Sequence, residues 1–174
     1  MDEHTKIDLK PVTHITTDAI GPPGQRVFYI QGWKDKTVIS LIIEKFQIQT
    51  LAIGVEQFLA EIQQRLPELQ EASRNYEENK MHILPPVEPL FRVSEFGLSY
   101  DSKSDLVALI AREVPTGGEE KGSEVHYWCS RSQLRAMIHW GLEVATRGRP
   151  ICPQCGQPMD PEGHFCARKN GHKH

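Results

Sequence analysis

The chain has 174 residues, of which 39% are hydrophobic and 25% are charged, and its formal net charge is −3. This balance is typical of a soluble globular protein and excludes a disordered chain, and the length suits one ordinary domain with a small appendage. No apolar run approaches the roughly 18 residues of a membrane helix. The charged first ten residues contain no apolar core, so we expect no secretory signal.

The first third of the chain predicts an antiparallel meander after a loose arm over residues 1–13. Strands are expected over 14–20, 26–31 and 37–44, the last nearly continuous in apolar residues and therefore buried. The turns between them are GPPGQ (21–25) and GWKDK (32–36), where glycine and proline supply the required backbone angles.

The hydrophobic period then changes to three and four residues, which predicts an amphipathic helix over 45–66 that Pro67 ends. Its buried face should comprise Ile48, Leu51, Ala52, Val55, Leu59, Ile62 and Leu66. Gly54 costs about 1 kcal/mol relative to alanine in a helix, and we interpret it as a point of close packing. Phe46 and Phe58 are assigned to the core.

The second half repeats this order of elements after a polar, proline-rich connector over 67–89. Strands are expected over 91–101, 105–114 and 124–129, with a charged loop at 115–123. Ser130 and Gln133 have the spacing of a capping box that opens a helix ending at 147–150. The apolar stripe of this helix is Leu134, Met137, Ile138, Gly141, Leu142 and Ala145.

These elements predict an α+β fold, in which two βββα units form an antiparallel sheet with the helices on one face. We assign residues 14–149 to this domain and residues 150–174 to a separate zinc-binding tail.

The tail is rich in possible metal ligands. Cys152 and Cys155 have the C-x-x-C spacing that presents two sulfurs to one ion, and His164 and Cys166 point to one side of an extended strand. Two such pairs make a Cys₃His set, which is usual for a closed, structural zinc site.

Two other interpretations of the tail stay open. His172 or His174 could replace His164 as the fourth ligand. A redox-active C-x-x-C is the rival chemistry, although the three nearby prolines disfavour the helix on which such a motif usually lies.

Charge is distributed unevenly along the chain. Residues 131–174 carry seven lysines and arginines against three acids, so the remainder is acidic. Phosphate contacts would come from Arg131, Arg135, Arg147, Arg149, Arg168 and Lys169, and base stacking from Trp128, Trp140 or Phe165. We therefore expect a non-enzymatic binding or adaptor module with nucleic acid or another protein as partner, although the pI near 6.2 weighs against nucleic acid.

The alternative function is an enzyme that acts on a small anionic substrate carrying a phosphate or carboxylate. Its candidate residues are Arg26, Glu44, Lys45, Arg92 and Asp101. Cys129, near His126 and His139 in sequence, is a candidate thiol, but a buried structural cysteine is the commoner case.

Several segments resemble an uncharacterised bacterial family catalogued as a domain of unknown function. They are GPPGQRVFYIQ, VISLIIEKFQIQTLA, EPLFRV…LSYD and GRPICPQCGQPMDPEGHFCARKNGH, and the resemblance covers roughly residues 14–174. It implies a cytoplasmic bacterial protein with a zinc-knuckle-like end that uses Cys152, Cys155, His164 and Cys166. It implies no activity.

Overall fold

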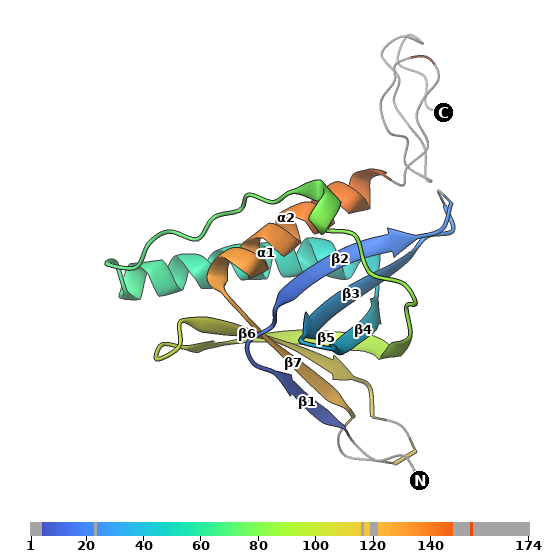
Figure 1. The fold of residues 1–174 in the computed structure, drawn as a ribbon, viewed down its shortest axis with the longest axis horizontal. Coiled ribbons are helices and arrows are strands. Elements are labelled where there is room, and N and C mark those ends of the chain that lie inside the picture. Colours follow the sequence, from blue (N-terminus) through green and yellow to red (C-terminus); the bar gives the residue numbers. More distant parts are fainter. Residues whose placement is uncertain (1–4, 23, 116, 119–121, 148–153, 155–174) are drawn as a thin grey trace.

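The computed structural model describes residues 5–22, 24–115, 117–118, 122–147 and 154. They form a sheet of seven strands and two long helices (Figure 1). The strands are β1 Lys6–Leu9, β2 His14–Ile20, β3 Val27–Lys34, β4 Thr37–Ile43, β5 Pro89–Asp101, β6 Leu106–Glu113 and β7 Glu124–Cys129. The helices are α1 Lys45–Arg65 and α2 Arg131–Arg147, with one short 3₁₀ turn, η1 Glu78–Lys80. The α+β class and the two βββα units are confirmed.

The sheet is mixed, so the prediction of an antiparallel sheet was wrong. Its strand order is β1-β7-β6-β5-β4-β3-β2. Each βββα unit contributes an antiparallel meander, but β4 and β5 pair in parallel where the units meet. The physical reason is that α1 carries the chain back along the sheet before β5 begins, and parallel neighbours need such a crossover.

The loose arm predicted over residues 1–13 contains a strand instead. β1 pairs in parallel with β7, from Lys6 opposite Glu124 to Leu9 opposite Tyr127. The segment after β1 then joins distant strands, because the Val12 N–H donates to the Trp128 carbonyl at 2.8 Å and the Thr13 N–H to the Trp33 carbonyl at 2.7 Å. The two ends of the sheet are therefore brought together, and the sheet begins at Lys6.

The turn between β3 and β4 is tighter than GWKDK suggested. β3 continues to Lys34 and β4 begins at Thr37, so only two residues turn, with Asp35 at a φ of 53°. Gly32 lies inside the strand because the Tyr127 ring packs on it: a Cβ there would be 2.6 Å from Tyr127 Cδ1.

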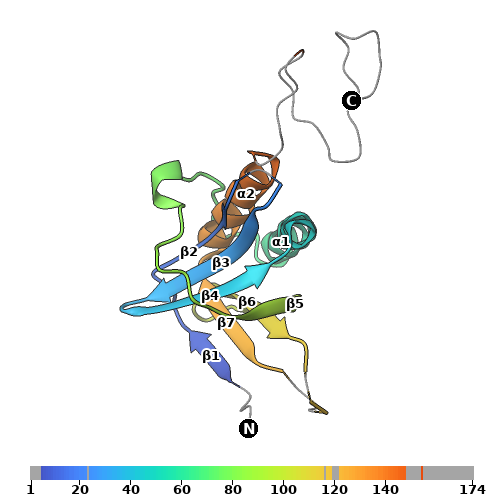
Figure 2. The ribbon, with the colours of Figure 1, turned by 90° about the vertical axis from the view of Figure 1, so that its right-hand side faces the viewer.

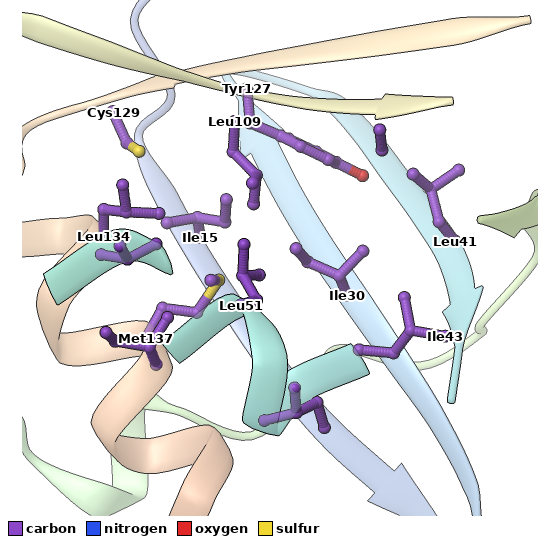
Figure 3. Packing of buried hydrophobic residues seen from close by; sticks show 14 of the residues in the cluster. Ile15, Ile30, Leu41, Ile43, Leu51, Leu109, Tyr127, Cys129, Leu134 and Met137 are labelled. Atoms are coloured by element: carbon purple, nitrogen blue, oxygen red, sulfur yellow. The ribbon is translucent and has the colours of Figure 1, made fainter. Parts of the chain in front are cut away.

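Both helices lie next to each other on the same side of the sheet, as two perpendicular views show (Figures 1 and 2). Ile15, Ile30 and Leu41 of the sheet face Leu51, Leu134 and Met137 of the helices in one core (Figure 3). The capping box that opens α2 is confirmed, since the Gln133 N–H donates to Ser130 Oγ at 3.0 Å and the Ser130 N–H to Gln133 Oε1 at 2.8 Å.

The connector between α1 and β5 runs along the outer side of β2 and is held there by side chains. Thr16 Oγ1 donates to the Met81 carbonyl at 2.5 Å. Gln31, which is fully buried, exchanges two hydrogen bonds with the backbone of Leu84. Within the described residues, the connector thus lies over the edge strand β2 and is fastened to it and to β3 through side chains.

Neither helix of the described part of the chain has the length and apolar character needed to cross a membrane.

Candidate functional site

The predicted metal ligands Cys152, Cys155, His164 and Cys166, and the alternatives His172 and His174, lie outside the described residues. The same is true of Arg149, Phe165, Arg168 and Lys169. Within the described ranges, no group of three or more histidine, cysteine, aspartate or glutamate side chains is placed to hold a metal ion. The zinc site stays a prediction from the sequence.

Arg131 lies at the start of α2 and is largely buried. Its guanidinium grips both oxygens of Asp105, with Nε–Oδ1 at 2.9 Å and Nη2–Oδ2 at 3.2 Å, and Nη1 donates to the Gln70 carbonyl at 2.9 Å. This bidentate geometry is the strong form of an arginine–carboxylate pair. It joins α2 to the β5–β6 turn and to the connector.

Arg135 follows one turn later and connects α2 to α1. Its Nε donates to Glu56 Oε1 at 2.9 Å and its Nη1 to the Ala72 carbonyl at 2.7 Å. His139 Nε2 lies 2.8 Å from the same Glu56 oxygen. Partial burial raises the pKa of Glu56, but hydrogen bonds from Arg135 and His139 outweigh it and hold the pKa below its ordinary value. Arg131 and Arg135 line a cavity of about 370 Å³ between the helices.

Arg147, the last residue of α2, is also paired. It donates to Glu78 at 2.7 Å and to Glu143 at 3.2 Å, and its guanidinium lies 5.1 Å from the Trp140 ring centroid. All three described members of the predicted phosphate-binding set therefore bind carboxylates of the same chain. Their positive charge is locally compensated, which does not favour phosphate contacts.

The tryptophans proposed for base stacking are engaged in the body of the protein. Trp140 is 1% exposed. Trp128 donates from Nε1 to Asp8 Oδ1 at 3.1 Å, and Lys10 Nζ lies 4.0 Å from its ring centroid.

The candidate enzymatic residues are distributed among separate contacts. Arg92 pairs with Glu44 beside the start of α1, whereas Arg26 donates to the Val144 carbonyl at 3.1 Å in the last turn of α2. Asp101 pairs with Lys10 at 3.0 Å, and bonds from Lys10 and Ser104 lower its pKa to about 2. These groups do not line one common pocket among those found in the described residues.

Cys129 is a buried structural residue. Its side chain is fully enclosed, and burial raises the pKa of the thiol to about 12. A thiol with this pKa is not an activated nucleophile at neutral pH. His126 lies near Asp8 and Glu124, and His139 contacts Glu56, so neither histidine activates it.

A pocket that sequence reasoning missed lies between α1 and β5. Its volume is about 400 Å³, and its lining is mostly apolar. The lining residues are Phe46, Gln47, Thr50, Leu51, Gly54, Ser94, Glu95, Phe96, Gly97 and Leu98.

Two of our interpretations of α1 are corrected at this pocket. Phe46 is 64% exposed and is not a core residue. Gly54 is not a point of close packing, because a Cβ there would meet nothing within 4 Å. The signal available in the sequence was the same glycine: a residue that costs helix stability without a packing role can leave a surface open.

The exposed residues of α1 between positions 45 and 60 are all uncharged, although the partly exposed Lys45 and Glu56 lie beside them. These exposed residues are Phe46, Gln49, Thr50, Ile53, Gln57 and Ala60. Ile53 is 63% exposed, close to the value for Phe46. We call these six residues the uncharged α1 face. A quarter of the whole chain is charged, and depletion of charge with exposed aromatic and aliphatic groups is typical of the centre of a protein interface.

A family model described as a protein of unknown function, DUF3090, matches residues 7–166. The chain belongs to this family. The match begins within β1 and ends at Cys166, so it includes both βββα units and the four predicted zinc ligands. No curated protein and no solved structure gives a significant match. The DUF3090 assignment therefore agrees with the resemblance but brings no activity or ligand to this chain.

Proposed function

We propose that this DUF3090 protein is a zinc-binding, non-enzymatic adaptor whose α+β body binds another protein. The observation that carries the choice of partner is the uncharged α1 face beside the apolar pocket. A partner that buries Phe46 and Ile53 would remove two large apolar side chains from water without desolvating any charge of that face.

The zinc part of the proposal rests on the sequence. Cys152, Cys155, His164 and Cys166 supply a complete tetrahedral set within fifteen residues. Ligands that meet only after folding link metal binding to the folding of their own segment. We therefore expect a structural zinc ion that organises the tail.

Another protein is preferred over nucleic acid because of the contacts that the described arginines make. Arg131, Arg135 and Arg147 are each paired with an acid of the same chain. A phosphate backbone would have to displace these carboxylates, which lowers the gain from each contact. Nucleic acid would then depend on Arg149, Arg168 and Lys169 in the tail.

The alternative, an enzyme for a small anionic substrate, is not favoured by the contacts of its candidate residues. Arg26 donates a hydrogen bond to the backbone at the end of α2, whereas Arg92 pairs with Glu44 at the start of α1, so the two guanidinium groups lie in different places. Turnover would require both groups to reach one substrate, with an acid or base in hydrogen-bonding distance.

One preparation tests both parts of the proposal. The full-length, untagged protein is purified without chelators, and zinc per chain is measured together with the ratio of absorbance at 260 and 280 nm. We expect one zinc per chain and an absorbance ratio typical of protein alone. Absence of zinc would overturn the metal assignment and favour redox chemistry at Cys152 and Cys155. Co-purified nucleic acid whose binding weakens steeply with salt would overturn the choice of partner.

A further inference from the structure

We propose that the first partner of the uncharged α1 face is the same face of a second copy of this chain. In this symmetric dimer, Phe46 of each copy enters the opening between Thr50, Ile53, Gly54 and Gln57 of the other. The inference rests on the proposed function, because it names the protein that binds at the same surface.

The opening has the form into which helices pack. Thr50, Ile53, Gly54 and Gln57 stand at positions i, i+3, i+4 and i+7, the four corners of a hole that receives one side chain of a facing helix. Gly54 contributes no side chain to its own corner, and no atom of the described residues lies within 4 Å of where its Cβ would be. Two of the four corners, Thr50 and Gly54, also line the pocket of about 400 Å³ that continues to Phe96 and Leu98 of β5.

A side chain that fits the hole is present on the same helix. Phe46 is 64% exposed and precedes Thr50 by one helical turn. Buried aromatic side chains dominate the energy of many interfaces. Leaving this ring in water is costly for a monomer, whereas a pocket of the observed size accommodates it.

The spacing of Phe46 and its hole makes the surface self-complementary. If two α1 helices pack antiparallel about a twofold axis near Thr50, Phe46 of one copy lies opposite the hole centred between Ile53 and Gly54 of the other. The reciprocal contact then follows by symmetry, as it must in a twofold interface. Because each chain carries both the hole and the aromatic side chain that fills it, two identical chains can form the contact.

Charge permits this contact between identical copies. Each chain has a net charge of −3, so two copies repel each other only weakly as they approach. The six residues of the uncharged α1 face place no charge at the centre of the contact, and the nearest charge on the pocket lining is the exposed carboxylate of Glu95.

The size of the uncharged α1 face indicates how tightly two copies should associate. From Phe46 to Ala60 it extends about 21 Å at 1.5 Å per residue. Only Phe46 and Ile53 are large apolar side chains on it, so we expect a reversible dimer rather than an obligate one. Such a dimer would carry two tails, which strengthens binding to any target with two sites.

The experiment is sedimentation velocity on the full-length, zinc-loaded chain over a wide range of concentrations. The wild type should pass reversibly from monomer to dimer, and Phe46→Glu should weaken self-association at least tenfold. This substitution places an acid in the first turn of α1, where the helix dipole favours it, so the fold should be retained. Val114→Glu is the matched control, because Val114 is 57% exposed and lies outside α1; it should associate like the wild type.

A reciprocal pair distinguishes this arrangement from other dimers. Gly54→Lys alone should weaken association, because its side chain fills the hole. Combined with Phe46→Glu, it should recover association, since the introduced carboxylate of one copy then faces the introduced ammonium group of the other. The proposed arrangement would be overturned by a monomeric wild type at every concentration, by a dimer that persists in Phe46→Glu, or by the lack of any recovery in the double variant. Each of these results leaves the zinc measurement and the search for a different protein partner unaffected.

Discussion

Gly32 and Gly54 occupy opposite environments, one tightly packed and one open, and single substitutions at the two positions should therefore have opposite effects on stability. The ring of Tyr127 packs on Gly32, whereas a Cβ on Gly54, in the middle of α1, would meet no atom of the described residues within 4 Å. One glycine permits a close approach between two parts of the curled sheet, and the other leaves a surface pocket open.

We expect Gly54→Ala to raise the free energy of unfolding by about 1 kcal/mol, the gain in helix propensity. Gly32→Ala should lower it by about 1 to 3 kcal/mol, because the new Cβ displaces Tyr127 from a packed core. Denaturant unfolding of both variants checks the pair. Destabilisation by Gly54→Ala would show that position 54 is packed after all.

At the scale of elements, Glu56 of α1 forms hydrogen bonds and an ion pair with side chains of α2. One of its oxygens accepts from both Arg135 and His139. Together with Arg131, which reaches Asp105 and the connector, this contact fixes the helices to each other and to the chain between α1 and β5. The basic residues of α2 thus serve mainly to assemble the body.

We expect Glu56→Gln to lower the free energy of unfolding at neutral pH by about 1 kcal/mol, a modest value because the side chain is 37% exposed. The pKa of Glu56 is lower in the folded than in the unfolded chain. Its contribution is therefore complete above the unfolded pKa and disappears as the pH falls through the folded one. The difference between wild type and variant should shrink on acidification, as measured by denaturant unfolding at several pH values. Glu61→Gln, on an exposed carboxylate of the same helix, is the control and should have little effect at any pH.

For the whole molecule, the question is whether the tail is an appendage or part of the fold. Within the described residues, the buried side chains of the core come from the seven strands, both helices and the segments between them, and we predict that the zinc ligands form a separate unit. Zinc ligands restricted to the tail should therefore control only the tail.

We expect Cys155→Ser to release zinc while the body keeps its near-UV circular dichroism and its cooperative melting transition. Collapse of the whole fold would instead make the tail integral to it. His164→Ala should weaken zinc more than about tenfold, since even the loss of a group that only supports a ligand costs this much. An unchanged affinity would move the fourth ligand to His172 or His174.

The sequence by itself determined the elements of the body, because hydrophobic periodicity reports local structure directly. β2, α1, β6, β7 and α2 lie where the pattern placed them to within about two residues, and all the predicted apolar positions of α1 except the partly buried Leu66 are buried. A resemblance to a family of unknown function and the pattern of possible zinc ligands were likewise visible in the residues alone.

Only the tertiary structure decided which strands are neighbours and which surface is left open. β1 was missed because its four residues gain stability from β7, more than one hundred positions away, and no local pattern reports such a partner. The parallel pairing of β4 with β5 depends on the path of the crossover. Likewise, the sequence alone suggested that Phe46 is a core residue and that Gly54 is a point of close packing. Their exposure follows from the orientation of α1, whose inner face is occupied by the sheet and α2.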